Sequence, residues 1–274
     1  MTTAFTEIEG FRCYAPELAR NDADYPSEGF DVTAAVEATS FWCRTRTRII
    51  RDVIERFTDA SRTLDMLEIG CGIGGVVGAL RPLPHLRLTA SEVYLQALRY
   101  ARARVAGVQF IQLDATAMPF REEFDIIGAF DVLEHIDDDD RVIEGVGAAL
   151  RRDGLFLVTV PQHKWMWSAL DEIVCHKRRY SRADLLGKLR RHGFEILFCS
   201  SFVTLLFPAM AASRLVSRLR GRSTDRKRAF AAEVTLPPLA NRICDVLMRA
   251  DEAALRARLS LPFGGSLLAV ARRS

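Results

Sequence analysis

The sequence has little of what marks disulfide-built, nucleic-acid-binding or membrane-spanning proteins. Its six cysteines are scattered, with no CxxC pair and no spacing that suits a zinc site. The formal net charge is only +3, which is too small an excess to indicate nucleic acid as a partner. The best candidate for a membrane-spanning helix, residues 196–212, is short and contains Pro208. We therefore expect a protein of the reducing cytoplasm that neither spans a membrane nor binds nucleic acid.

Signal-like segments, repeats and low-complexity tracts are also absent from the sequence. The N-terminal segment MTTAFTEIEGFRCYAPE contains acidic residues and no apolar core, which is unlike a signal peptide. Of the 274 residues, 49% are hydrophobic, so a substantial buried core can form.

Apolar runs of strand length alternate with helical patterns along the middle of the chain. The runs read LDMLEIG, LRLTASE, VQFIQLD, FDIIGAFDVL and GLFLVTVP, and segments with helical spacing separate most of them. Such alternation is typical of a parallel sheet with helices on both faces, the doubly wound α/β architecture.

The ends of the chain depart from this alternation. We expect an arm or lid over residues 1–39, followed by one main domain over residues 40–274. The segment FWCRTRTRIIRDVIERF places arginines between apolar residues at helical spacing and predicts an amphipathic helix at the start of that domain. A long, mostly helical stretch separates FEILFCSS from the last strand candidate, GGSLLAVARRS. We interpret residues 203–262 as a helical insertion that helps to build the substrate site.

A glycine-rich loop follows the first of these strands, in DMLEIGCGIGG. Glycines let the backbone turn sharply and approach a ligand where a Cβ would collide. The spacing of Gly70, Gly72 and Gly75 fits the dinucleotide fingerprint, and Glu92 stands where a ribose-binding acid belongs. The glycines alone therefore allow either a nicotinamide dinucleotide or another nucleoside cofactor.

Three features favour S-adenosylmethionine over a dinucleotide. Glu68 lies two residues before Gly70, where it can accept hydrogen bonds from an ammonium group but would repel a pyrophosphate. The glycine motif comes after a helix and well into the chain, whereas a dinucleotide fold usually begins with it. Asp114 then follows the third strand, and FDIIGAFDVLEHI forms the fourth.

In these motifs the sequence resembles the class I S-adenosylmethionine-dependent methyltransferases. The resemblance is to small-molecule enzymes with an E/D-x-G-x-G-x-G first motif and a DVLEHI fourth motif, and it covers residues 64–160 closely. It implies a Rossmann-like, mostly parallel seven-stranded sheet whose last strand, in GGSLLAVARR, is antiparallel. It also implies S-adenosyl-L-methionine as the cofactor.

The resemblance implies which residues hold the methionine and ribose parts of the cofactor. Gly70, Cys71 and Gly72 would pass under the methionine, and Glu68 would support its amino group. Glu92 would hold both ribose hydroxyls, which a carboxylate can do with its two oxygens.

The resemblance also places residues around the adenine and at the end of the fourth strand. Asp114 and Ala115 would flank the adenine, with Asp114 accepting from its exocyclic amine, and Phe130 and Asp131 would line the cofactor. A simpler interpretation of Glu92 and Asp114 stays open, because carboxylates at strand ends often cap the next helix or are merely solvated.

The helix before the first motif supplies two further candidates. FWCRTRTR resembles a segment that precedes the first motif in some of these enzymes, which implies that Trp42 covers the cofactor and that Arg46 pairs with its carboxylate. The alternative is a solvated basic helix face with a core tryptophan.

Catalytic candidates lie after the fourth and fifth strands, because ligands of open α/β sheets bind outside the carboxyl ends of the strands. Methyl transfer needs a base only if the acceptor must lose a proton. We predict His135, in DVLEHIDDDD, and Asp171 and His176, in PQHKWMWSALDEIVCHKRRYS, as catalytic residues. The alternative for the second run is a helix pinned by tryptophans and by salt bridges to Arg178 and Arg179.

A metal site is a further interpretation of the fourth motif. Asp131, Glu134 and His135 resemble the D/E-x-x-E-H site of some quinone-biosynthesis methyltransferases, and such ligands suit magnesium, manganese or zinc. The same letters occur in metal-free relatives, and Glu134 can cap or pair locally. We therefore expect no metal, and we expect His135 to act as a base or as a wall of the site.

The insertion begins with an apolar stretch and becomes arginine-rich, in FVTLLFPAMAASRLVSRLRGRS. This order suits an interfacial helix at an anionic membrane, and so predicts peripheral contact through residues 203–228. The alternative is a helix pair that closes over the active site and exposes a basic turn.

Together these patterns predict an enzyme that moves a methyl group from S-adenosylmethionine to an oxygen or nitrogen of a small molecule. The runs PQHKWMW and LPFGGSLLAVARR resemble bacterial methyltransferases, some linked to glycan or lipid assembly, which implies a glycan- or lipid-linked acceptor. A nicotinamide-dependent oxidoreductase is one alternative. An inactive methyltransferase fold that serves as a binding or scaffold subunit is another.

Overall fold

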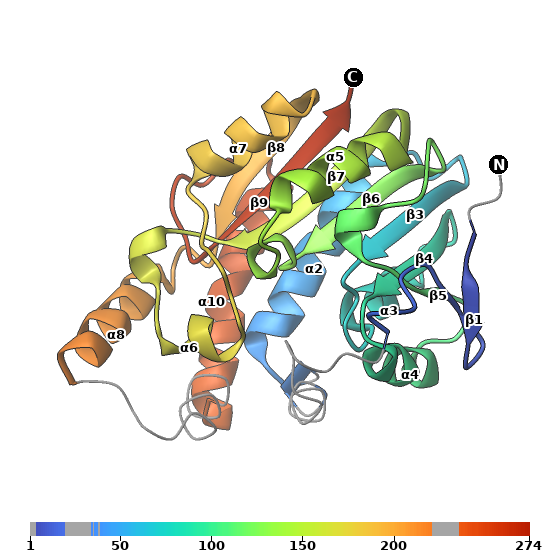
Figure 1. Ribbon diagram of the computed structural model, residues 1–274. Helices are drawn as coiled ribbons and strands as arrows, with labels where there is room; N and C mark the ends of the chain where they lie inside the picture. The colour runs from blue at the N-terminus through green and yellow to red at the C-terminus, as the bar shows by residue number, and fades with distance from the viewer. Residues whose placement is uncertain (1–3, 20–33, 35, 38, 221–235) are drawn as a thin grey trace.

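A nine-stranded sheet forms the centre of the computed structural model, which describes residues 4–19, 34, 36–37, 39–220 and 236–274 (Figure 1). The strand order is β1-β2-β5-β4-β3-β6-β7-β9-β8. The strands are β1 (Thr6–Ile8), β2 (Phe11–Cys13), β3 (Leu64–Ile69), β4 (Leu86–Glu92), β5 (Gln109–Gln112), β6 (Phe124–Phe130), β7 (Leu150–Pro161), β8 (Phe194–Phe202) and β9 (Ser266–Arg273).

The strand directions confirm the doubly wound α/β fold. Strands β5, β4, β3, β6 and β7 are parallel, and β9 runs antiparallel to both of its neighbours, β7 and β8. The carboxyl ends of the parallel strands therefore meet at one edge of the sheet. Apart from Trp42 and Arg46 on the helix at residues 41–57, the cofactor and acceptor candidates come from the ends of these strands or from the segments that follow them.

The expected number of seven strands was wrong, because a short hairpin from the N-terminal arm adds β1 and β2. Strand β2 pairs in parallel with β5, and the amide of Tyr14 donates to the carbonyl of Gln112 at 2.9 Å. Glu9 and Gly10 both have positive φ, as a two-residue hairpin turn requires. The hairpin covers what would be an open sheet edge with unpaired backbone groups. A lid formed by the rest of residues 1–39 lies largely outside the described residues.

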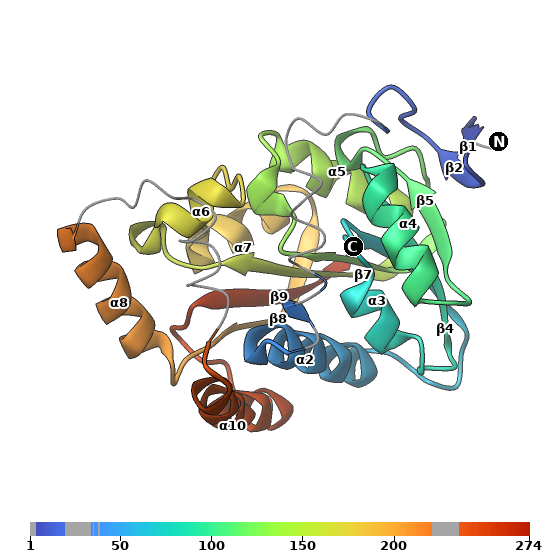
Figure 2. The same cartoon turned by 90° about the horizontal axis from the view of Figure 1, so that it is seen from below.

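Helices cover both faces of the sheet and enclose two separate cores (Figure 2). One core lies under α2 (Phe41–Phe57), α3 (Gly75–Leu80), α4 (Leu95–Arg104) and α10 (Pro238–Arg256). The other lies under α5 (Asp139–Ala149) and α7 (Arg182–Arg191). Successive residues of β3 alternate between them, with Met66 in the first core and Leu67 in the second.

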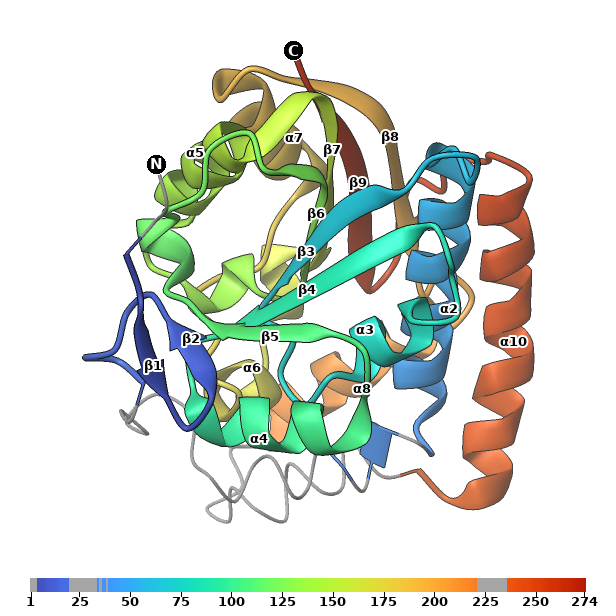
Figure 3. The same ribbon diagram turned by 90° about the vertical axis from the view of Figure 1, so that its right-hand side faces the viewer.

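The insertion before the last strand is helical where it is described. It contains α8 (Phe207–Arg220) and α10, and α10 runs alongside α2 (Figure 3). Arg48 of α2 bonds to Glu252 at 2.6 Å and to Asp245 at 3.0 Å, so the acids of α10 face α2. Among the described residues, no helix is long and apolar enough to cross a membrane.

The burial pattern predicts which leucines carry the stability of the fold. Leu267, on β9 between β7 and β8, is fully buried, whereas Leu239 on α10 is 72% exposed. We expect Leu267→Ala to lower the free energy of unfolding by about 2–5 kcal/mol, because it leaves a cavity in the core between the sheet and helices α5 and α7. Leu239→Ala should change it by less than about 0.5 kcal/mol. Urea denaturation of both variants tests this, and equal effects would contradict the assigned core.

Candidate cofactor and acceptor site

The loop after β3 leaves room for a ligand above its glycines. Gly70 and Gly72 have φ of +66° and +52°, which favours glycine at both positions. A Cβ at Gly70 would lie 2.6 Å from a methyl group of Val132, whereas a Cβ at Gly72 would meet nothing within 4 Å. The buried Cys71 donates its amide to the carbonyl of Ser91 at 2.9 Å, which fixes the loop against β4. The backbone at Gly72 is therefore open to an approaching group.

Glu92 ends β4 beside this open backbone. Its carboxylate accepts hydrogen bonds from the amide of Gly72 at 3.1 Å and from its own neighbour Val93 at 2.7 Å. Burial raises the pKa of Glu92, although these amide donors oppose the shift. The side chain thus stands at the mouth of the glycine loop, where two vicinal hydroxyls of a ribose could bind.

Glu68 is a buried carboxyl group that lacks a full set of partners. Its side chain is 3% exposed, and its Oε2 atom has no hydrogen-bond partner among the described residues. Burial raises the pKa of Glu68 to about 8, although the charge of Arg46 and a backbone hydrogen bond at Val77 oppose the shift. An incoming ammonium group would supply the missing donor. The donor set therefore fits the amino group of a methionine.

Asp114 and Ala115 follow β5 at the same edge of the sheet. One carboxylate oxygen of Asp114 accepts from both the amide and the hydroxyl of Thr116, each at 2.8 Å. This oxygen caps the short helix that begins at Ala115, as the simpler interpretation of the sequence allowed. The contact to an adenine stays a prediction.

Arg46 links helix α2 to the end of β6. Its Nε lies 2.6 Å from Oδ2 of Asp131, and its Nη2 donates to the carbonyl of Phe130 at 3.1 Å. The guanidinium also lies over the ring of Trp42, at 5.0 Å from the centroid. Asp131 has a φ of +57°, a strained conformation of the kind that clusters at functional sites. The expected pairing of Arg46 with a cofactor carboxylate stays a prediction; here its partner is Asp131.

Two of the predicted catalytic residues form a hydrogen-bonded pair. Oδ1 of Asp171 lies 2.8 Å from Nδ1 of His176 and accepts from Nε of Arg179 at 2.7 Å. The other carboxylate oxygen accepts from the amide of Ser168 at 2.8 Å. Although burial acts in the opposite direction, the bonds from His176 and Arg179 lower the pKa of Asp171 to about 2. Asp171 is therefore a fixed anion that orients the imidazole.

The third predicted catalytic residue, His135, lies against the same imidazole. The ring centroids of His135 and His176 are 4.7 Å apart. Burial and the neighbouring His176 lower the pKa of His135 to about 4, so its ring is neutral at neutral pH. The structure thus brings His135, which follows β6, together with Asp171 and His176, which both follow β7.

Glu134 completes this cluster. It is fully buried, and neither carboxylate oxygen has a hydrogen-bond partner among the described residues. Burial and the charge of Asp131 raise the pKa of Glu134, and its Oε1 lies 3.8 Å from Nε2 of His176. Ligand atoms of Glu134, His135 and His176 lie within 4.8 Å of one another and could hold a divalent cation. The expectation that no metal takes part stays a prediction.

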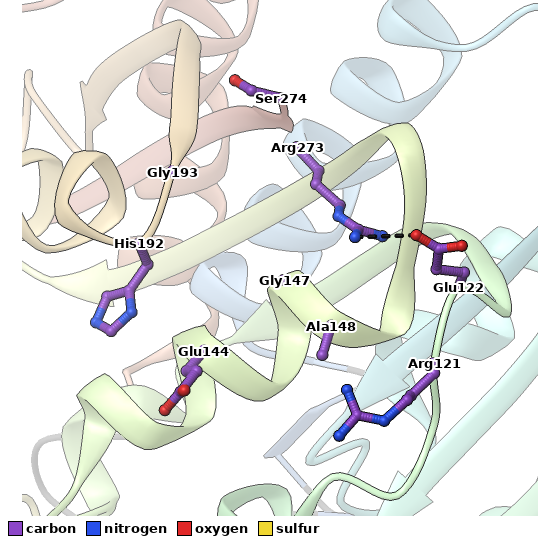
Figure 4. A pocket seen from close by; sticks show the side chains of 9 residues that line it. All are labelled: Arg121, Glu122, Glu144, Gly147, Ala148, His192, Gly193, Arg273 and Ser274. Atoms are coloured by element: carbon purple, nitrogen blue, oxygen red, sulfur yellow. Dashed lines mark ion pairs between the residues drawn. The ribbon is translucent and has the colours of Figure 1, made fainter.

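A surface hollow of about 510 Å³ is lined by other residues than this cluster, and Figure 4 shows its lining. It opens at the amino ends of β6 and β7 and contains the ion pair between Arg273 and Glu122, 3.0 Å apart. Because ligands of open α/β sheets bind at the carboxyl ends of the strands, we do not assign a function to this hollow. None of the predicted site residues lines it.

Comparisons with known proteins agree with the glycine loop and the sheet order. A family model described as a methyltransferase domain matches residues 67–158. Over 154 residues the chain is 25% identical to a probable S-adenosylmethionine-dependent methyltransferase of Mycobacterium tuberculosis, covering 55% of this chain and 56% of that protein. These matches identify a methyltransferase domain over residues 67–158 and support a class I S-adenosylmethionine-dependent methyltransferase.

Two further proteins resemble this chain, one in sequence and one in fold. A ubiquinone biosynthesis O-methyltransferase of Rhodopseudomonas palustris is 31% identical over 115 residues, which cover 39% of this chain and 44% of that protein. The crystal structure of Haemonchus contortus phosphoethanolamine N-methyltransferase 2 with S-adenosyl-L-methionine superposes with a TM-score of 0.59 at 17% identity, covering 94% and 59% of the two chains. The match thus spans about half the length of the curated relatives.

The comparisons support S-adenosylmethionine as the cofactor. S-adenosylmethionine is the cofactor of the class I methyltransferases, and the nicotinamide alternative is set aside. The orphaned carboxyl oxygen of Glu68 and the open backbone at Gly72 fit that cofactor.

Sequence reasoning missed how the acceptor half of this methyltransferase site is supported. Ser168 and Asp171 form a capping box at the start of the short helix α6 (Ala169–Ile173), and the spacing S-A-L-D could have revealed it. Glu134 was expected to cap or pair locally, but its oxygens are buried without such bonds among the described residues. Glu37, which lies against Gly75 and pairs with Arg104 at 2.6 Å, carries no sequence signal that we can identify.

The raised pKa of Glu68 predicts a pH-dependent stability of the methyltransferase without cofactor. Because the folded state holds this proton more tightly than the unfolded chain, the contribution is full at low pH. It is lost as pH rises through about 8. We expect Glu68→Gln to remove this loss, so that its free energy of unfolding falls less than that of the wild type between mildly acidic and mildly alkaline pH. Denaturant titrations across this range check it, and parallel curves would show that Glu68 is ionised in the fold.

Proposed function

We propose that this chain transfers a methyl group from S-adenosylmethionine to an oxygen or nitrogen of a small-molecule acceptor. The observation that carries the proposal is the Asp171–His176 pair, at 2.8 Å, beside the cofactor edge of the sheet. Glu134 lies between the two parts of the site, because it is near His176 and follows the strained Asp131 by three residues. A proton acceptor and a cofactor cradle thus share one edge.

The cofactor half of the site would bind through the glycine loop and two acids. Gly70, Cys71 and Gly72 would lie under the methionine portion, Glu68 would accept from its ammonium group, and Glu92 would accept from the ribose hydroxyls. When bound, S-adenosylmethionine supplies a methyl group on a sulfonium that is already an excellent leaving group. The chain therefore has to orient the acceptor and, where needed, remove its proton.

His176 is the residue that we assign to proton removal. Asp171 is ionised and accepts from Nδ1–H, which leaves the lone pair of Nε2 facing the cluster of Glu134 and His135. An acceptor hydroxyl or ammonium group near Nε2 would pass its proton to this imidazole as the methyl group arrives. His135, with a pKa of about 4, is a weak base and serves as a neutral wall.

The acceptor class is proposed from the names of similar proteins and from one sequence resemblance. One relative is named as an O-methyltransferase and another as an N-methyltransferase, so both nucleophiles are kept. The resemblance of the loop after β7 to enzymes of glycan and lipid assembly supports an acceptor linked to a glycan or a lipid. An inactive fold that binds the cofactor without turnover is the competing function.

Removal of the base should abolish turnover and spare the cofactor. We expect His176→Asn and Asp171→Asn to lower the rate of S-adenosylhomocysteine release by about 10²-fold or more, measured with whichever phenol, sugar or amine the wild type methylates. The affinity for S-adenosylhomocysteine should stay within about threefold, because neither side chain belongs to the glycine loop. His192→Asn, which alters a histidine paired with Asp140 elsewhere, is the matched control.

Two results would count against this assignment. Wild-type turnover in His176→Asn would mean that positioning alone drives the transfer. Tight cofactor binding with no turnover of any acceptor would favour the inactive fold.

A further inference from the structure

Helix α10 packs Met248 and Leu255 into the core but leaves four other large apolar side chains exposed. Leu239, Ile243, Val246 and Leu247 are 72%, 52%, 59% and 39% exposed. They recur at helical spacing, so they form one continuous stripe, here called the α10 stripe. Surface helices usually turn such a stripe toward the core, and a contiguous exposed apolar patch marks an interaction surface.

The acidic residues of the same helix point inward. Asp251 and Glu252 are buried; Glu252 binds Arg48 of α2, and Asp251 accepts from the amide of Thr204 at 2.6 Å. Asp245 also bonds to Arg48, at 3.0 Å. The acids of α10 therefore all form contacts within the fold, and none of them lies on the exposed face of the helix.

The exposed charges around the α10 stripe are positive. Arg242 and Arg249 are exposed on α10 at either side of Val246. Residues 203–250 contain nine Lys and Arg against three Asp and Glu, although the whole chain has a net charge of only +3. The positive charge of the protein is thus concentrated in the insertion that carries the stripe, and the rest of the chain is net negative.

We propose that the α10 stripe docks on an anionic lipid surface. An apolar stripe flanked by arginines gains from burial among acyl chains and from attraction to acidic headgroups. A second copy docked through the same stripe would bring Arg242 and Arg249 of the two chains together, so charge complementarity favours the lipid. This proposal concerns α10 itself, beyond the contact through residues 203–228 that the sequence predicts; residues 221–228 of that segment lie outside the described residues.

The docking face lies beside the end of the molecule where the acceptor would enter. Asn241 of α10 accepts from the amide of Phe41 at 2.8 Å, at the start of the helix that carries Trp42 and Arg46. Lipid contact would hold the methyltransferase site close to the membrane surface. This consequence, unlike the docking itself, rests on the proposed function.

Vesicle binding of the full chain tests the proposal. We expect sedimentation with vesicles of phosphatidylcholine and phosphatidylglycerol, weaker binding to phosphatidylcholine alone, and release at high salt. The double variant Ile243→Glu/Val246→Glu should bind at least about tenfold more weakly, because it removes two apolar anchors and adds negative charge. Thr63→Glu/Gln109→Glu, which places the same charges on exposed residues outside α10, is the control and should bind like the wild type.

Each alternative outcome is distinguishable. Equal vesicle binding by wild type and the α10 variant would overturn the proposal, as would no binding by the wild type. Light scattering that shows a wild-type dimer, converted to a monomer by Ile243→Glu/Val246→Glu, would assign the stripe to a second copy instead. Binding of S-adenosylhomocysteine by the α10 variant would show that the variant is folded. If the wild type does not bind S-adenosylhomocysteine, the proposed function is wrong, whereas the docking proposal is tested only by the vesicle measurements.

Discussion

The guanidinium of Arg46 is the cation on which the cofactor side of this structure depends. It pairs with Asp131 at 2.6 Å and bonds to the carbonyl of Phe130, so it ties helix α2 to the end of β6. Burial raises the pKa values of Glu68 and Glu134, and the charge of Arg46 opposes this rise without cancelling it. One arginine thus acts electrostatically on both of these buried acids and pairs directly with a third, Asp131.

A second arginine has the matching role on the acceptor side. Arg179 holds Asp171 as an anion, and Asp171 in turn fixes His176. The two halves meet at Glu134, whose oxygens lack hydrogen-bond partners among the described residues. Helix α2 is itself braced by the buried acids of α10, through Arg48. The insertion therefore holds the helix that carries Trp42 and Arg46, while the α10 stripe stays exposed.

Local patterns in the sequence were enough to predict the alternating strands, the glycine loop and the acids at the strand ends. These features follow from short-range periodicity and from residues that need a particular backbone, such as Gly70 and Gly72. The β1–β2 hairpin was missed because two three-residue strands carry too little periodicity to be seen. The pairing of Arg46 with Asp131 could not be predicted either, since it depends on how α2 packs across 85 residues of chain. His135, Asp171 and His176 were named singly, but their contact required the tertiary fold.

The most direct test of this account is calorimetric titration with S-adenosylhomocysteine and, separately, with NADH. The account predicts that the wild type binds S-adenosylhomocysteine and not NADH, and that Glu92→Ala binds S-adenosylhomocysteine about tenfold to a hundredfold more weakly because two charge-assisted hydrogen bonds to the ribose are lost. Absence of binding, a preference for NADH, or an unchanged affinity in Glu92→Ala would contradict the assignment of the glycine loop and of the acid at the end of β4.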